Sequence, residues 1–180
     1  MNKLLIALVF SLASLALHAQ TFTLKSQEVG GQATINQVFD GFGCTGKNTS
    51  PQLNWENAPK GTQSFAITMY DPDAPTGSGW WHWLAFDIPK DVHEIKSGAG
   101  TTNDIPMPAG SIQSPNDYGQ KSYGGPCPPE GDGLHRYIIT IYALKTEKLG
   151  LDENTNAAIV GYYLNSNTIQ KASIIMYYQR

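Results

Sequence analysis

The sequence has little cysteine, little charge and, after its first nineteen residues, no apolar run long enough to cross a membrane. Two of its 180 residues are cysteine and 15% are charged, with 12 Lys and Arg against 15 Asp and Glu. No basic run occurs, which argues against nucleic acid or an anionic membrane surface as a partner held by bulk charge. A single small anion held by local donors stays compatible with this composition. Internal repeats and low-complexity stretches are absent, so we expect one globular domain.

Residues 1–19 have the pattern of a secretory signal. Lys3 supplies a short positive segment, an apolar stretch runs from Leu4 to Leu17, and Ala19 precedes a cleavage site before Gln20. An uncleaved anchor is the alternative, but the stretch falls short of the ~20 residues that a spanning helix needs. We expect cleavage to leave residues 20–180 as one domain, in the periplasm or outside the cell. The loss of Lys3 changes the net charge from −3 to −4.

The two cysteines, Cys44 and Cys127, are expected to form one disulfide in an oxidising compartment. The bridge would close a loop of roughly 80 residues and stabilise the fold by up to ~4 kcal/mol in the chain-entropy model. Two free thiols are the alternative. In that case Cys127, near a histidine, becomes a candidate nucleophile.

Runs rich in β-branched and aromatic residues, bounded by Gly, Pro, Asn and Asp, predict an all-β fold. The runs are SFAITMY (64–70), WHWLAFDI (81–88), RYIITIYAL (136–144) and SIIMYY (173–178), with shorter candidates at 21–26 and 52–56. Short connections favour antiparallel pairing. The long segment 91–125 is irregular apart from a short strand expected near Ser111, and we expect it to cover part of the surface near a site.

One peripheral helix is also expected, with a second possible. Asp152 or Asn154 is a suitable N-cap, and the helix should run to about Asn165. The residues available for its packed face are Ala157, Ala158, Ile159, Tyr162 and Tyr163.

Three of the predicted strands carry polar residues at one end only. Side chains two apart share a strand face, which groups Asp71 with Phe65, Ile67 and Met69. The same rule groups His82 with Leu84, Phe86 and Ile88, and groups His135 and Tyr137 with Ile139 and Ile141. If the first run pairs antiparallel with the other two, Asp71, His82, His135 and Tyr137 meet at one rim of the sheet. The alternation therefore predicts a polar pocket over an apolar floor.

The segment YGGPCPPEGDGLHRY, residues 123–137, lies directly before the third run. Its glycines, Gly124 and Gly125, let the backbone approach a ligand, and its three prolines hold an extended path. Such a loop can offer backbone N–H groups to an anion without any lysine. A rigid surface connection is the simpler interpretation.

Other chemistries fit the residues less well. DPDAP after an apolar run resembles the nucleophile motif of haloacid-dehalogenase phosphatases, but Pro75 stands where that motif has Thr or Val, and the framework here is antiparallel. A zinc site from His82, His135 and an aspartate lacks the close ligand pair of the usual motifs. We expect no metal and no cofactor.

DPDAPTGSGWWHW, followed about forty residues later by YGGPCPPEGDGLHRY, resembles the paired signatures of the phosphatidylethanolamine-binding proteins, also called the Raf kinase inhibitor-like family. The segment CTGKNTSPQLNWENAPKGTQSFAITMYDPDAP is similar to the bacterial YbhB/YbcL-type branch. The likeness extends from about Phe22 to Arg180. It implies an antiparallel β-sandwich of a large and a small sheet, with a pocket for phosphate-like and carboxylate groups. The C-terminal helix that covers this pocket in eukaryotic members is not expected here.

By motif match, the resemblance assigns two groups of residues to the pocket. Its lining positions would be Asp71, Asp73, Pro75, His82, Pro129, His135 and Tyr137, and its wall would come from Tyr123, Gly125, Pro126 and Cys127. The resemblance also implies that the bond between Ala74 and Pro75 can be cis.

Together these observations predict a binding protein that is not an enzyme. Its partner would be a small anionic ligand such as phosphate, phosphoethanolamine or a carboxylate, with no nucleic acid; a homodimer is possible. The donors would be loop amides, the Tyr137 hydroxyl and both histidines, so affinity should weaken above pH ~6.5 if histidine charge contributes. Asp71 would orient a histidine and Asp73 would shape the turn. The alternatives are a protein-interaction module such as a protease inhibitor and, less favoured, a phosphatase or hydrolase.

Overall fold

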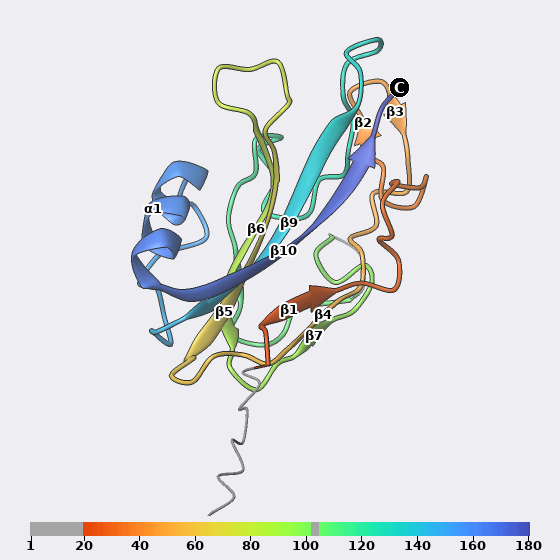
Figure 1. Ribbon diagram of the computed structural model, residues 1–180. Coiled ribbons are helices and arrows are strands. Elements are labelled where there is room, and N and C mark those ends of the chain that lie inside the picture. Colours follow the sequence, from red (N-terminus) through yellow and green to blue (C-terminus); the bar gives the residue numbers. More distant parts are fainter. Residues whose placement is uncertain (1–19, 102–104) are drawn as a thin grey trace, which may run out of the picture.

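The computed structural model describes residues 20–101 and 105–180, so the predicted signal segment lies outside the described residues. The described chain forms short strands, four long strands and one helix (Figure 1). The elements are β1 (Thr23–Lys25), β2 (Asp40–Gly41), β3 (Cys44–Thr45), β4 (Leu53–Glu56), β5 (Ser64–Asp71), β6 (Trp80–Pro89), β7 (Glu94–Ile95), β8 (Ile112–Gln113), β9 (His135–Leu144), α1 (Ala157–Asn167) and β10 (Thr168–Tyr178).

The large sheet is antiparallel and has the order β10-β9-β5-β6-β8, and a small sheet has the order β1-β4-β7. The mainly β antiparallel fold is therefore confirmed. The last strand is longer than predicted, because β10 begins at Thr168, directly after α1, and pairs with β9 along its whole length. The short strand expected near Ser111 is confirmed as β8 of the large sheet. Segment 91–125 is less irregular than expected only because it also contributes β7 to the small sheet.

Two apolar clusters hold the layers together, one on each face of the large sheet. The first lies toward the small sheet and includes Phe65, Ile67 and Met69 of β5 with Trp55 of β4. The second lies under α1 and includes Ala66 of the same strand. The alternation of β5 between the two clusters is the expected result for a strand buried on both faces. Figure 1 shows α1 and the small sheet on opposite sides of the large sheet.

The helix begins later than predicted and packs through different residues. Its N-cap is Asn156, whose side chain accepts a hydrogen bond from the Ile159 amide at 3.0 Å. Moving the cap by two to four residues rotates the buried stripe to Ala157, Val160 and Leu164, so Ala157 alone of the predicted face is buried. Ala158, Ile159, Tyr162 and Tyr163 are exposed. None of the helices in the described part of the chain is long and apolar enough to cross a membrane.

Candidate functional site

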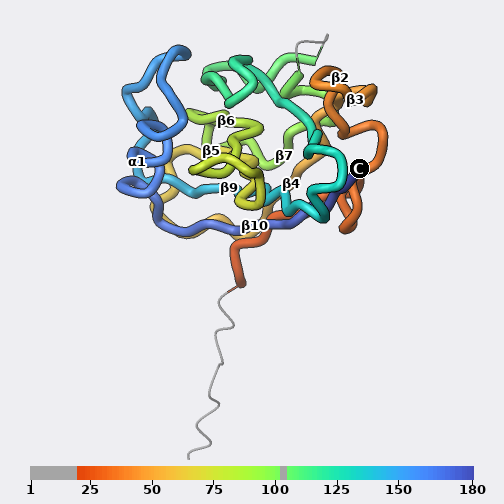
Figure 2. Tube along the Cα trace, turned by 90° about the horizontal axis from the view of Figure 1, so that it is seen from above, coloured from red at the N-terminus to blue at the C-terminus, as the bar shows by residue number. Residues whose placement is uncertain are grey.

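The polar ends of three strands meet at one end of the large sheet, as the alternation predicts. β5 lies between β6 and β9, and its last residue, Asp71, pairs with Trp80 at the start of β6. On the other side Tyr70 pairs with Ile138, which places the beginning of β9 beside the end of β5. The loops after β5 and before β9 and the β2–β3 turn gather at this same end (Figures 1 and 2).

His82 reaches this site by a route that simple alternation does not describe. The pairing of β5 with β6 shifts between Met69–Trp83 and Tyr70–Trp81, which leaves His82 as the extra residue of a β-bulge. A bulge places two consecutive side chains on the same side of a strand. Trp83 accordingly lies in the cluster toward the small sheet, while the His82 ring packs against the Tyr137 ring with centroids 5.0 Å apart.

The predicted face of β6 is therefore wrong beyond His82. Leu84 and Phe86 lie in the cluster under α1, whereas Ile88 lies in the opposite cluster. A second register shift, between Phe65–Ile88 and Ile67–Ala85, explains why Ile88 changes sides.

A cavity of about 260 Å³ opens at this end of the sheet. It is lined by Phe42, Asp71, Ala74, Pro75, Thr76, Trp80, His82, Tyr118, Cys127, Pro128, Pro129, His135 and Tyr137. Seven of these residues are predicted from the sequence, whereas Phe42, Trp80 and Tyr118, among others, are not. Phe42 and Tyr118 come from loops, where no periodicity indicates which side chains turn inward. In the sequence, the two consecutive tryptophans before His82 are the feature that could have indicated Trp80 as a lining residue.

Asp71 and His135 form a buried pair at the cavity. The His135 Nδ1 lies 2.7 Å from Asp71 Oδ2, and the two side chains are only 2% and 3% exposed. The other Asp71 oxygen accepts the Asp73 amide at 2.8 Å, and His135 Nε2 lies 3.1 Å from Asp132 Oδ2. Only a doubly protonated ring can donate both of these histidine hydrogen bonds at once. The expectation that Asp71 orients a histidine is met by this geometry, and the histidine is His135.

His82 is held in a different state by its surroundings. Its Nδ1 lies 2.8 Å from the Gly124 carbonyl oxygen, which can only accept, so Nδ1 carries the proton. Burial lowers the pKa of His82 to about 4, although the Gly124 carbonyl opposes the shift. His82 is therefore neutral at pH 7. At this pH it adds no positive charge to the cavity, and the charge expected from a protonated His82 requires a pH near 4 or below.

This burial makes stability depend on pH. Below pH 6.5 the unfolded chain protonates His82, while the folded protein does so only near pH 4. As the pH drops from 6.5 to 4, protonation of His82 should therefore lower the free energy of unfolding by about 3 kcal/mol. Urea denaturation at pH 7 and at pH 4 measures how much unfolding free energy is lost between the two pH values. The loss should be smaller for His82→Gln than for the parent protein, and His93→Gln should lose as much as the parent. Equal losses in all three proteins would contradict the neutral state of His82.

Two polar groups of the cavity lining have no hydrogen-bond partner among the described residues. They are the Tyr137 hydroxyl and the Trp80 indole N–H, and both atoms are buried. Burial, and next the Asp71 carboxylate, raises the pKa of Tyr137 well above its usual range, so the phenol keeps its proton. An unsatisfied buried donor is uncommon and calls for an explanation such as a ligand.

The glycine- and proline-rich loop supports the cavity more than it lines it. Cys127 and Pro129 are in the lining, but Tyr123, Gly125 and Pro126 are not. The Tyr123 hydroxyl donates to the Gln37 carbonyl at 3.0 Å, and the Pro126 carbonyl accepts the Phe39 amide at 3.1 Å. Through these contacts the loop holds the segment of the chain that contains Gln37 and Phe39.

The loop amides are largely committed to the protein itself. The Gly124 amide donates to the His82 carbonyl at 2.8 Å, and the Gly125 amide donates to Asn48 Oδ1 at 2.8 Å. A Cβ at Gly125 would lie 1.9 Å from the Gln37 carbonyl oxygen, so this glycine serves close backbone packing. Gly124 and Gly125 therefore do not supply free N–H donors, contrary to the expectation from sequence.

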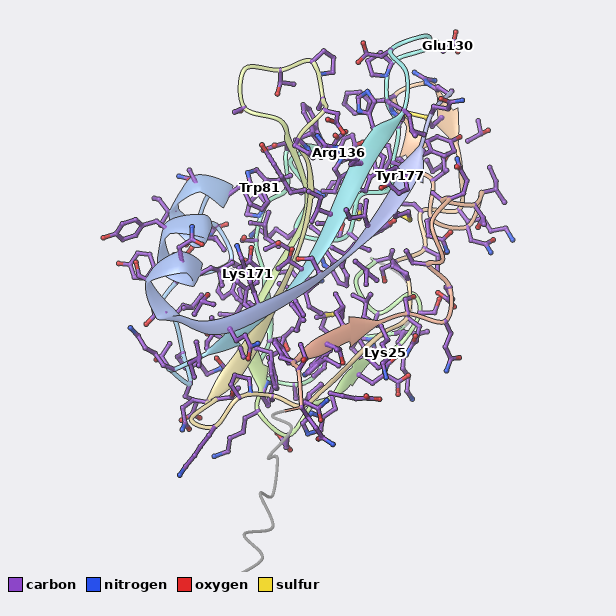
Figure 3. All side chains as sticks on the ribbon, viewed as in Figure 1. Lys25, Trp81, Glu130, Arg136, Lys171 and Tyr177 are labelled. Carbon is purple, nitrogen blue, oxygen red and sulfur yellow. A yellow bond between two sulfur atoms is a disulfide. The ribbon has the colours of Figure 1, made fainter. Side chains whose placement is uncertain are left out.

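Asp73 is not in the cavity lining, whereas Pro75 is. The Arg136 guanidinium donates to Asp73 Oδ2 at 2.9 Å and to Oδ1 at 2.6 Å. This hydrogen bonding lowers the pKa of Asp73 to about 2. Figure 3 labels Arg136 near the start of β9. The peptide bond between Ala74 and Pro75 is trans, so the cis expectation is wrong.

The predicted disulfide is present and holds the outer wall of the cavity. Cys44 and Cys127 are joined, with their Cα atoms 6.0 Å apart, and the bond is drawn in yellow in Figure 3. The bridge ties the β2–β3 turn, which carries Phe42, to the cavity wall. Arg180 reinforces the tie, because its guanidinium donates to the Pro128 carbonyl at 2.6 Å and to the Gly43 carbonyl at 3.0 Å.

Within residues 20–101 and 105–180, no three His, Cys, Asp or Glu side chains gather in a way that suits a metal ion. The thiol and the aliphatic hydroxyl of the cavity lining are both engaged in other contacts. Cys127 is oxidised, and the Thr76 hydroxyl donates to the Gly79 carbonyl.

Comparison with known proteins gives consistent matches over the described domain. The family model described as phosphatidylethanolamine-binding protein matches residues 25–179. The chain is 46% identical over 181 residues to the UPF0098 protein YbcL of Escherichia coli, covering 99% of both chains, and 43% identical over 145 residues to YbhB of the same organism, covering 81% of this chain and 90% of YbhB. The crystal structure of E. coli YbcL, titled a new member of the mammalian PEBP family, superposes with a TM-score of 0.86 at 49% identity, over 88% of this chain and 98% of that one. A homologue from Chlamydia trachomatis gives 0.72 at 25% identity, over 88% and 97%.

Proposed function

Because the chain belongs to the phosphatidylethanolamine-binding protein family, we propose that it is a binding module that holds a small oxyanion in the cavity at the end of its large sheet. The ligand group would be the phosphoryl part of a phosphomonoester or of a lipid head group. Its oxygens would accept hydrogen bonds from the Tyr137 hydroxyl and the Trp80 indole, and the positive charge of His135 would lie behind them.

The observation that carries this proposal is the unpartnered Tyr137 hydroxyl. A buried phenol without a partner destabilises the free protein by about 1–3 kcal/mol. Tyr137 lines an open cavity together with Trp80, whose indole N–H is the second unpartnered donor. Ligand oxygens would accept hydrogen bonds from both groups, which would explain why two buried donors have no partner in the free protein.

A binding role is favoured over catalysis by the state of the nucleophile candidates. The disulfide removes the thiolate of Cys127, and the Thr76 hydroxyl donates a hydrogen bond to the Gly79 carbonyl. His82 has no hydroxyl or thiol among the described residues as a hydrogen-bond partner, so the pairing of base and nucleophile that covalent catalysis needs is not met by these residues.

We place this function outside the cytoplasm. The Cys44–Cys127 disulfide persists in oxidising compartments and is uncommon in reducing ones. The composition of residues 1–19 supports the same location.

Tyr137→Phe tests the proposal because it should change binding and stability in opposite directions. Calorimetric titration with methyl phosphate at pH 5 should show at least ~10-fold weaker binding, the loss expected for one hydrogen bond to a charged group. Urea denaturation should show a ligand-free protein that is more stable than the parent by about 1 kcal/mol.

Tyr142→Phe is the matched control. Tyr142 lies on the same strand but packs in the cluster under α1, so its loss should leave the affinity unchanged. Absence of methyl phosphate binding by the parent protein, or equal binding by Tyr137→Phe, would overturn the proposed function.

A further inference from the structure

We propose that the cavity selects the protonated monoanion of a phosphomonoester over its dianion, because His82 offers the ligand a hydrogen-bond acceptor. This inference rests on the proposed function and specifies which form of the ligand the cavity takes. His82 is the residue that determines this specificity.

The geometry of His82 leaves one nitrogen for a ligand. Nδ1 donates to the Gly124 carbonyl at 2.8 Å, and in a neutral ring the other nitrogen is then an acceptor. Nε2 makes no hydrogen bond to any described residue, and the ring lines the cavity. The Gly124 carbonyl is itself fixed by the chain on either side, since the amides of Gly124 and Gly125 both have partners. The tautomer is therefore set by the backbone.

Burial and the nearby charge favour this neutral state against the Gly124 and Gly125 backbone, which opposes it. Burial is the main cause that keeps its pKa at about 4, and the positive charge of His135 on β9 acts in the same direction. The remaining titratable groups of the lining are Asp71 at the end of β5, Tyr137 on β9 and Tyr118 from the loop before it. Both tyrosines have a raised pKa and stay neutral. No lysine or arginine of the described residues lines the cavity.

The donors and acceptors of the lining match a ligand that still carries one proton. Tyr137 and Trp80 can donate to ligand oxygens, whereas both N–H groups of His135 are already directed to carboxylates. His82 Nε2 can only accept, and Asp71 repels a second negative charge. A dianion would leave Nε2 unsatisfied inside a desolvated cavity, while the O–H of a monoanion satisfies it. Recognition of a hydrogen-bonding group in this way discriminates strongly against an analogue that lacks it.

Methyl phosphate and methyl sulfate test the inference directly. At pH 5 both are monoanions of nearly equal size, since a phosphomonoester loses its second proton at a pKa of about 6, but only methyl phosphate has an O–H. Calorimetry at pH 5 should show methyl phosphate binding at least ~10-fold more tightly. Between pH 5 and pH 8 methyl phosphate should weaken at least ~10-fold as it becomes a dianion, while methyl sulfate reports any change in the protein itself.

The outcomes separate the inference from the function on which it rests. Equal binding of the two ligands at pH 5 would overturn the protonation preference and leave the oxyanion site standing. Failure of both ligands to bind would overturn the proposed function. Methyl sulfate binding more tightly than methyl phosphate would show that the cavity presents a donor at this position and would overturn the inference.

His82→Gln should remove the preference, because a carboxamide can turn its NH2 group to the ligand. We expect the ratio of the two affinities to fall below ~3-fold in this variant and to stay at ~10-fold or more in the control His93→Gln, whose residue lies outside the cavity lining. Nitrogen NMR of the parent protein provides a measurement that needs no variant. It should show His82 as the neutral Nδ1–H tautomer at pH 7, and an Nε2–H tautomer or an imidazolium would overturn the inference.

Discussion

Replacing both Cys44 and Cys127 by serine is expected to lower the free energy of unfolding by about 4 kcal/mol. The two residues are 83 positions apart, so the bridge restricts a large part of the unfolded chain. In the chain-entropy model a loop of this length contributes about 4 to 5 kcal/mol, and removal of a native disulfide typically costs about 2–5 kcal/mol. Chemical denaturation at pH 7 should show the loss, and wild-type protein under reducing conditions should reproduce it.

Arg180→Ala provides the comparison for the non-covalent tie across the same wall. Its guanidinium joins the Pro128 and Gly43 carbonyls, close to the two cysteines, without restricting the unfolded chain. Its loss should therefore cost much less, about 1–3 kcal/mol for hydrogen bonds to a charged group. Equal effects of the two changes would show that the disulfide acts through local contacts in the folded state and not through chain entropy.

The strands that form the site could be predicted because their patterns are regular. β5 and β9 keep the alternation of apolar side chains to their ends, so the positions of Asp71, His135 and Tyr137 on one face follow from counting residues. The pairing of β5 with both neighbours was an assumption at that stage, since sequence alone does not determine strand order. The short connection between β5 and β6 favoured their pairing, but no short connection links either strand to β9.

The two bulges of β6 could not be predicted. They depend on how the backbone of β6 fits against β5, and the residues around His82 carry no proline or glycine that would indicate an irregular strand. His82 was assigned to the site for a reason that the structure corrects, since the bulge and not the alternation turns its ring toward Tyr137. The neutral state of His82 was also out of reach because it depends on burial, and its tautomer was out of reach because it depends on a carbonyl 42 residues away.

The loop residues of the cavity lining show a second limit of prediction from the sequence. Tyr118 and Phe42 contact each other, with ring centroids 5.3 Å apart, although 76 positions separate them in the chain. Their approach depends on the disulfide and on the path of two loops, and neither follows a period. The glycines of the 123–137 segment signal close packing correctly, but the sequence does not indicate whether their amides face a ligand or the protein.

Asp71→Ala is expected to lower the free energy of unfolding by about 3–5 kcal/mol. Asp71 is 2% exposed, accepts the Asp73 amide and lies 2.7 Å from the Nδ1 of a histidine that is equally buried. Removal of Asp71 leaves the buried Nδ1–H of His135 and the Asp73 amide without their acceptor, which is the costly way to break a buried pair. Urea denaturation at pH 7, extrapolated linearly to water, measures the difference.

Asp132→Ala removes the other carboxylate from the same imidazole and is the matched control. The Asp132 side chain is 37% exposed and lies 3.1 Å from Nε2, so solvent can replace it and the loss should be below about 1 kcal/mol. Asp71→Ala combined with His135→Phe should be more stable than Asp71→Ala alone, because no buried imidazole N–H is then left without an acceptor. Similar small losses for Asp71→Ala and Asp132→Ala would contradict the buried pair. A double variant no more stable than Asp71→Ala would show that the loss arises from the Asp73 amide instead.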